Sequence, residues 1–227
     1  MIPFWFWPWA GISGNTYIIK PNEQTPLAMQ RAFKYIDQAG FPPGVINMVH
    51  GGMDVATGLI DHPDVKGISS VGSTPVAKSI YRRATDHCKR AQCHGGAHNF
   101  LVVMPDGNIE NALPNLYNSI FGNAGQRCLA GKVVVTVGNS KFHEHFKTKF
   151  VEGAKKLKLR FGMDKTVFLG PIVSKKSLDK LCGDVKKGLD EGAMMVLDGW
   201  GVKVEGYPKG YFLGPTILEN GKPGMYV

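Results

Sequence analysis

The feature that most constrains the fold is a regular alternation of short apolar runs with amphipathic helical segments. In the first part of the chain, strands are predicted at 15–20, 45–49 and 65–71, and helices at 26–39, after Gly51-Gly52, and at 75–87. Repeated strand–helix units favour an α/β fold with mostly parallel strands. Three such units in succession are typical of one half of a dinucleotide-binding domain.

The first of these helices has recognisable start and stop residues. Thr25 is the predicted N-cap, because its hydroxyl can accept a hydrogen bond from a free helical amide, and Pro26 suits the first helical position. Gly40 is expected to end the helix, since glycine adopts the left-handed conformation there at low cost.

The pattern restarts after a glycine-rich stretch at residues 90–99. Beyond it, strands are predicted at 100–104, 133–137, 194–197 and 211–218, and helices at 110–121, 140–159 and 177–191. We therefore predict two domains, residues 1–96 and residues 97–227.

Composition excludes several classes of protein. With 227 residues, 43% hydrophobic and 20% charged, the chain is long enough and apolar enough to bury a core. The cysteines are spaced irregularly, which predicts reduced thiols and neither a disulfide framework nor a metal site. They are Cys88, Cys93, Cys128 and Cys182.

The net charge of +9 has two interpretations. It could attract anionic ligands such as nucleotide phosphates, or it could reflect a solvated basic face. The lysines fall on helical stretches, which favours the solvated face, and no nucleic-acid-binding motif accompanies them.

The N-terminal segment MIPFWFWPWAGI is apolar but too short to span a bilayer, and it lacks the basic region of a signal peptide. No membrane partner is expected. Its aromatic side chains are suited to burial against neighbouring structure; they are Phe4, Trp5, Phe6, Trp7 and Trp9.

Cys128 is the candidate nucleophile. A cysteine reacts as its thiolate, which nearby cations, backbone amides or a helix N-terminus stabilise. Here the cysteine follows a glycine-bearing turn and is adjacent to Arg127, in FGNAGQRCLAG. Taken alone, a cysteine is more often a small buried hydrophobic residue than a catalyst.

The segment Gly125-Gln126-Arg127-Cys128 resembles the nucleophile motif of aldehyde dehydrogenases. Further blocks resemble that family in order and spacing: Gly14-Asn15-Thr16, Lys20-Pro21-Asn22-Glu23, Pro42-Pro43-Gly44-Val45-Ile46-Asn47, Val71-Gly72-Ser73, Leu169-Gly170-Pro171 and Gly214-Pro215-Thr216. The resemblance extends over nearly the whole chain. It implies an aldehyde dehydrogenase-like α/β fold, in which part of a Rossmann-type NAD-binding domain (1–96) precedes part of an α/β catalytic domain (97–227).

Within the family, the acylating methylmalonate-semialdehyde branch is the most similar. The segments that carry this similarity include INMVHGG, DHPDVKGISSVGS, VVMPDGNIENAL and VKVEGYPKGYFLGPTI. The resemblance implies oxidation of methylmalonate or malonate semialdehyde to propionyl-CoA or acetyl-CoA, as in valine and pyrimidine catabolism. It implies NAD as cofactor, coenzyme A as acyl acceptor and a location in the mitochondrial matrix.

The resemblance also assigns cofactor-binding positions. Lys20 and Glu23 fall where the family holds the adenosine ribose, and Gln24 occupies the next position. Gly72-Ser73 falls at the turn that binds the pyrophosphate, where amides at a helix start meet phosphate oxygens. Without the family, Lys20 is better explained as a solvated lysine at the end of a strand.

Two positions bear on substrate and deacylation. Arg127 can bind a substrate carboxylate in a bidentate geometry, or it can pack an interface. His94 stands where hydrolytic family members carry a water-activating glutamate and the acylating branch usually has asparagine. The acyl group is thus expected to pass to coenzyme A, with His94 as a possible base.

The resemblance further implies segments that this sequence does not contain. They include an upstream block with the oxyanion-stabilising asparagine and a downstream block that holds the nicotinamide ribose. We expect the isolated chain to be poorly stable and weakly active, and the tetramer of the full-length family to be doubtful for it. The alternative function is an inactive remnant that binds nucleotide weakly or associates with full-length subunits.

Overall fold

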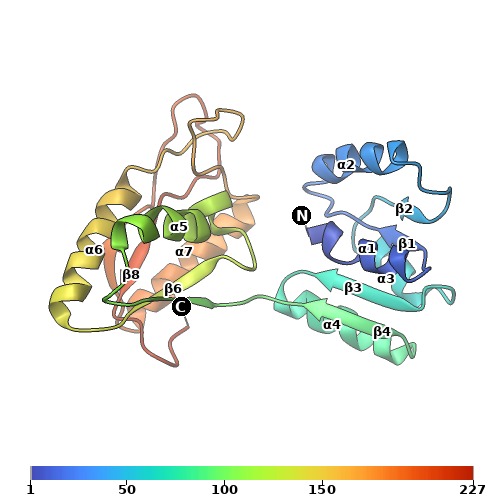
Figure 1. The fold of residues 1–227 in the computed structure, drawn as a ribbon, viewed down its shortest axis with the longest axis horizontal. Helices are drawn as coiled ribbons and strands as arrows, with labels where there is room; N and C mark the ends of the chain where they lie inside the picture. Colours follow the sequence, from blue (N-terminus) through green and yellow to red (C-terminus); the bar gives the residue numbers. More distant parts are fainter. Residues whose placement is uncertain (1, 227) are drawn as a thin grey trace. The chain divides into compact units, whose positions relative to one another are not determined.

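The computed structural model describes residues 2–226, which form two compact units, Met1–Gly96 and Ala97–Val227 (Figure 1). The units divide within the glycine-rich stretch where the strand–helix pattern restarts. Among the described helices, none is both long and apolar enough to cross a bilayer.

The first unit alternates strands and helices. Its elements are η1 (Ile2–Trp5), α1 (Trp7–Ile12), β1 (Tyr17–Ile19), α2 (Leu27–Gln38), β2 (Ile46–Met48), α3 (Met53–Asp61), β3 (Gly67–Val71), α4 (Thr74–Asp86) and β4 (Arg90–His94). Strand β1 pairs in parallel with β2, and β3 pairs in parallel with β4. Burial raises the pKa of Tyr17 in β1. The predicted α/β fold class is confirmed here.

Two details differ from the sequence prediction. Helix α2 begins at Leu27 with Pro26 as its N-cap and no side-chain cap, so the predicted Thr25 cap is wrong. The amide of Thr25 instead closes a turn by donating to the Asn22 carbonyl (3.2 Å). Strand β4 was not predicted, because its sequence RAQCH lacks the β-branched and aromatic residues that mark most strands.

The aromatic N-terminal segment folds into η1 and α1. Trp7 packs against a small core made by Ile19, Met29 and Ile36. Trp9, in contrast, is 71% exposed, so the burial expected for all five aromatic residues is only partly observed.

The second unit is built around one parallel strand pair. Its elements are β5 (Asn99–Val103), α5 (Ile109–Phe121), η2 (Gly122–Gly125), β6 (Gly131–Thr136), α6 (Ser140–Lys155), α7 (Lys175–Asp190), β7 (Met194–Leu197) and β8 (Ile217–Glu219). Strands β5 and β6 are parallel, whereas β7 and β8 are antiparallel. The predicted helix 140–159 ends earlier, at Lys155, and most of the predicted strand 211–218 is irregular.

Helices α5 and α6 supply the core of the second unit together with β5. Phe150 lies in its centre and stacks with Phe146, Tyr117 and Phe121, at ring-centroid distances of 5.5, 5.3 and 6.0 Å. Burial raises the pKa of Tyr117, whose hydroxyl donates to the Phe150 carbonyl (3.1 Å). This packing fixes the helix that leads into the segment containing Cys128.

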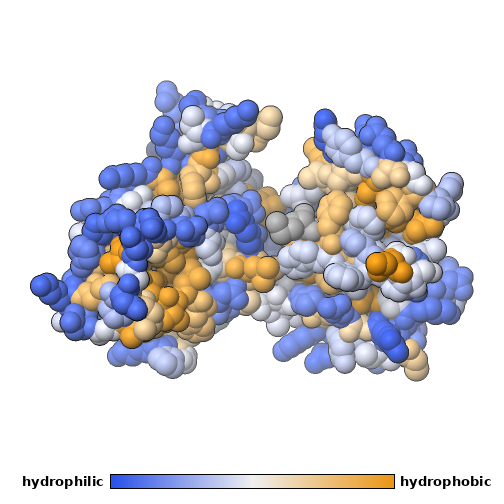
Figure 2. Space-filling view, viewed as in Figure 1, coloured by the Kyte–Doolittle hydropathy of each residue, from blue (hydrophilic) through white to orange (hydrophobic). Residues whose placement is uncertain are grey.

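Strand β5 buries only one of its faces. Leu101 and Val103 point into the core, whereas Phe100 and Val102 are 65% and 60% exposed. Apolar side chains also reach the surface elsewhere in both units (Figure 2). In α/β domains both faces of a parallel sheet are normally covered, so this exposed apolar face is unusual.

Candidate active site around Cys128

Cys128 occupies the second position of a tight turn between η2 and β6. The turn is closed by the Ala130 amide, which donates to the Arg127 carbonyl (3.2 Å). Asn99 reaches the same turn, and its side-chain nitrogen donates to the Cys128 carbonyl (2.7 Å) and the Ala130 carbonyl (2.9 Å). Cys128 is a free, half-buried thiol in this arrangement.

The segment just before the turn is strained. Asn123, Ala124 and Gly125 all have positive φ angles, of 55°, 51° and 69°. Glycine adopts this conformation freely and asparagine tolerates it, whereas it costs roughly 1–2 kcal/mol at Ala124. Such strain persists where surrounding contacts enforce it, and it is concentrated at functional loops.

Gln126 provides part of that enforcement. Its side-chain oxygen accepts from the Val173 amide (2.9 Å), and its nitrogen donates to the Pro171 carbonyl (3.2 Å). The same nitrogen also donates to the Asn123 carbonyl (3.2 Å). The glutamine therefore ties the loop before Cys128 to a segment more than forty residues further along the chain.

Lys132 holds the loop from the other side. The register of β6 against β5 shifts so that Asn99 pairs with Gly131 and Phe100 with Val133, which leaves Lys132 as the extra residue. A bulge of this type redirects a side chain. The Lys132 ammonium donates to the Gly125 carbonyl, and desolvation lowers its pKa.

Arg127 is exposed and folds back over the end of α5. Its Nη1 lies 3.4 Å from the Asn118 carbonyl, and a Cβ at Gly122 would come within 2.6 Å of its Nη2. Within residues 2–226 no carboxylate pairs with this guanidinium. The predicted contact with a substrate carboxylate stays a prediction.

The predicted ribose-binding residues lie together at the end of β1. The Lys20 ammonium is 3.7 Å from Glu23 Oε2 and donates to the carbonyls of Gly51 (2.9 Å) and Pro21 (3.0 Å). Gln24 follows in the same turn, where its amide donates to the Asn22 side chain (2.8 Å). A cationic donor beside an anionic acceptor fits the hydroxyls of a ribose, which both donate and accept hydrogen bonds.

Gly72 and Ser73 connect β3 to α4. Ser73 is the N-cap in an extended conformation, and its side chain makes no capping bond. The first amides of a helix have no partner within the helix, so this end suits a phosphate. The Gly72 amide donates to the carbonyl of His94 (3.0 Å), the last residue of β4. The predicted pyrophosphate turn and the predicted deacylation position are thus brought together, and the His94 ring lies 5.9 Å from that of Phe6.

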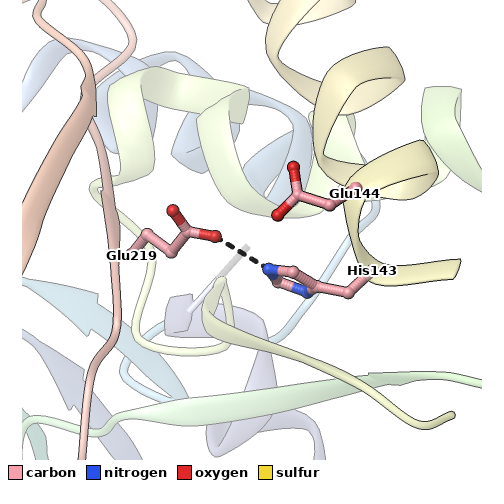
Figure 3. A group of neighbouring side chains, drawn as sticks. All are labelled: His143, Glu144 and Glu219. Atoms are coloured by element: carbon pink, nitrogen blue, oxygen red, sulfur yellow. Dashed lines mark hydrogen bonds and ion pairs between the residues drawn. The ribbon is translucent and has the colours of Figure 1, made fainter. Parts of the chain in front are cut away.

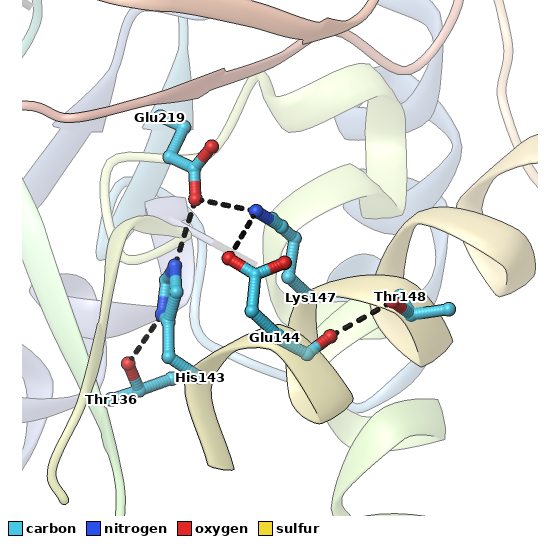
Figure 4. Close-up of polar contacts among 6 residues, drawn as sticks. All are labelled: Thr136, His143, Glu144, Lys147, Thr148 and Glu219. Atoms are coloured by element: carbon cyan, nitrogen blue, oxygen red, sulfur yellow. Dashed lines mark hydrogen bonds and ion pairs between the residues drawn. The ribbon is translucent and has the colours of Figure 1, made fainter. Parts of the chain in front are cut away.

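A separate polar cluster joins α6 to β8 (Figures 3 and 4). His143 Nε2 contacts Glu219 Oε1 (2.8 Å), and the Lys147 ammonium lies 2.9 Å from that oxygen and 2.7 Å from Glu144 Oε1. Thr136 Oγ1 contacts the other ring nitrogen of His143 (2.8 Å). Ligand atoms of the histidine and both glutamates lie close enough for a metal ion, but the ammonium already occupies the position between the carboxylates. The contacts with His143 and Lys147 lower the pKa of Glu219.

Sequence reasoning missed Asn99, Lys132 and this cluster. Asn99 and the His143–Glu219 pair join residues far apart in the chain, and Lys132 bonds a backbone carbonyl seven residues away. None of these residues belongs to a motif of recognised spacing. The available sign was weak: Asn99 is a polar residue at the first position of an apolar strand.

Comparison with known proteins gives one consistent result. Residues 1–227 match the aldehyde dehydrogenase family. All of this chain aligns with malonate-semialdehyde dehydrogenase of Lacticaseibacillus casei, at 42% identity. Of this chain, 99% aligns with the human mitochondrial acylating methylmalonate-semialdehyde/malonate-semialdehyde dehydrogenase, at 41% identity. The chain covers 45% and 42% of those relatives.

The structural comparison agrees. A putative methylmalonate-semialdehyde dehydrogenase from Sinorhizobium meliloti, solved in complex with NAD, has a TM-score of 0.92 and 35% identity; the match covers 99% of this chain and 46% of that one. The chain therefore spans less than half the length of the relatives that it matches.

Proposed function

Because the chain belongs to the aldehyde dehydrogenase family, we propose that it serves the oxidation of malonate or methylmalonate semialdehyde through a thioester on Cys128. The observation that carries this proposal is the strained, multiply bonded loop that presents Cys128. The names of relatives at 41–42% identity support the substrate class. These relatives are more than twice as long as this chain. The complete reaction is therefore proposed for a protein with the full family fold.

The first step belongs to Cys128. Its thiolate adds to the aldehyde carbon, so that a C–S bond forms, the carbonyl π bond opens and the oxygen carries the negative charge. The turn closed by Ala130 and bonded by Asn99 holds the sulfur for this attack, because both peptides that flank Cys128 are fixed. Arg127 orients the substrate through its carboxylate.

NAD, when bound, would accept the hydride from the adduct carbon, and Cys128 would then carry the acyl group as a thioester. Lys20 and Glu23 hold the adenosine ribose, with Gln24 beside them. The turn at Gly72 and Ser73 and the first amides of α4, which have no partner within the helix, would hold the pyrophosphate.

Coenzyme A completes the cycle in this proposal. Its thiol attacks the Cys128 thioester, the C–S bond to Cys128 breaks, and the enzyme thiol is restored. Loss of carbon dioxide gives acetyl-CoA from malonate semialdehyde and propionyl-CoA from methylmalonate semialdehyde. His94 takes the place of a water-activating glutamate, which suits transfer to a thiol, and in this proposal it is the candidate base.

A second function is favoured by a specific observation. Phe100 and Val102 leave an apolar sheet face open, and the chain covers less than half of its relatives. The alternative is a non-catalytic protein that binds nucleotide weakly or associates with full-length subunits, and an apolar face of this kind supports the association. The bovine and human relatives are named as mitochondrial and others are bacterial, so we propose a matrix location only for a eukaryotic source.

The test is NADH formation by the purified chain with malonate or methylmalonate semialdehyde, with and without coenzyme A. Turnover that needs coenzyme A and disappears in Cys128→Ala is the expected result. Cys182→Ala is the matched control, because Cys182 is also a free, half-buried thiol. A folded sample without turnover would contradict the catalytic proposal and favour the second function.

A further inference from the structure

The two peptides that flank Cys128 are held by different groups. The Arg127 carbonyl accepts from the Ala130 amide, which is part of the turn itself. The Cys128 carbonyl accepts from Asn99, which lies outside the turn at the start of β5. The backbone dihedral angles of Cys128 relate these two peptides and set the direction of its side chain. The bond from Asn99 fixes the orientation of the peptide after Cys128, which the hydrogen bond within the turn does not.

The geometry of Asn99 is specific to an amide. One nitrogen donates to two carbonyls, those of Cys128 (2.7 Å) and Ala130 (2.9 Å), which uses both of its hydrogens. Serine has a single hydrogen to donate and aspartate at neutral pH has none. Asn99 also pairs in the sheet with Gly131, the residue directly after the turn, so its side chain starts beside the carbonyls that it binds.

We propose that Asn99 is a positioning residue for the Cys128 nucleophile. It acts through the backbone of the turn and touches neither substrate nor cofactor. The effect on turnover rests on the proposed function, whereas the effect on the thiol itself does not. The two are measured separately for that reason.

The variants are Asn99→Ala, which removes both bonds, and Asn99→Ser, which retains one donor. The control is Asn115→Ala, because Asn115 donates its side-chain amide to a single helical carbonyl, that of Asn111 (3.0 Å). For Asn99→Ala we expect the rate of hydride transfer to fall about 100-fold with an unchanged KM for NAD, since misplacement by about 1 Å has effects of that order. Asn99→Ser is expected to have a rate between those of Asn99→Ala and the wild type. Asn115→Ala is expected to keep the wild-type rate.

The second readout needs no turnover. Iodoacetamide alkylation is followed at each cysteine by peptide mass spectrometry, and the ratio of the Cys128 rate to the Cys182 rate is compared. Release of the turn in Asn99→Ala is expected to change this ratio about tenfold, because two hydrogen bonds are lost at one site. General destabilisation would instead change the rates at both cysteines together.

The outcomes are distinct. If Asn99→Ala changes the ratio of the Cys128 and Cys182 alkylation rates but no protein turns over, the wild type included, the positioning role is supported and the proposed function is contradicted. A wild-type ratio and wild-type hydride transfer in folded Asn99→Ala overturn the positioning role. If both Asn99 variants fail to fold while Asn115→Ala folds, Asn99 is a folding residue and the proposal is wrong.

Discussion

The turn around Cys128 is held by more side-chain hydrogen bonds and a larger hydrophobic core than the strand end at Lys20. The side chains of Asn99, Gln126 and Lys132 fix the turn and the loop before it, and the main core cluster of this unit contains eight buried residues. The Lys20–Glu23 pair rests on a unit whose core cluster contains three. The candidate nucleophile is therefore preorganised within its own unit, whereas the proposed cofactor-binding groups depend on a less well-packed scaffold.

The largest expected effect comes from the better-packed core. Phe150→Ala removes the ring that stacks with three other aromatic residues, and it should lower the free energy of unfolding of the second unit by about 3–5 kcal/mol. Met29→Ala in the first unit is the counterpart, with an expected loss of about 2–3 kcal/mol. Hydrogen exchange read by mass spectrometry assigns each loss to its unit. Equal losses in both units would contradict the difference in packing.

The next effect concerns the loop. Gln126→Leu keeps the size of the side chain but removes its bonds to Pro171 and Val173, and it should destabilise the loop by about 1–2 kcal/mol. Faster hydrogen exchange over residues 122–131 is the measurement. Gln38→Leu, an exposed glutamine near the end of α2, is the control. Unchanged exchange in Gln126→Leu would mean that the strained residues are held by other contacts.

The smallest effect depends on pH. The pKa of Glu219 is lowered from its ordinary value of 4.5 by His143 and Lys147, so its charged form stabilises the folded state. That stabilisation is complete above the unfolded pKa and is lost as the pH falls through the folded pKa. Glu219→Gln should cost about 1 kcal/mol at neutral pH and progressively less below about pH 4.5. Urea unfolding at several pH values measures this difference, and a constant difference would exclude the charge as its source.

The strands and helices were largely predictable, because apolar periodicity reflects burial directly. Strands β5 and β6, and helices α3 and α5, lie within two or three residues of their predicted positions. Strand β4 could not be found in this way, because its half-buried positions are the small residues Ala91 and Cys93, which give a weak strand signal. The end of α6 was misplaced because Leu157 and Leu159 continue the apolar pattern after the helix has ended.

The site was predictable only in part. Cys128 and the cofactor positions followed from resemblance to a family, and the structure brings Lys20 near Glu23 and Gly72 near His94. Asn99 and Lys132 donate hydrogen bonds to backbone carbonyls. Every residue has a backbone carbonyl, so these acceptors leave no sequence motif. A contact of this kind becomes visible only when the chain path is known.

The most direct test of the account is to trap the thioester. The chain is incubated with malonate semialdehyde and NAD in the absence of coenzyme A, digested, and examined by peptide mass spectrometry. The account predicts an acyl adduct on Cys128 that disappears when coenzyme A is added. An adduct on Cys88 or Cys182 instead, or none on a folded sample that binds NAD, would contradict the assignment of Cys128 as the nucleophile.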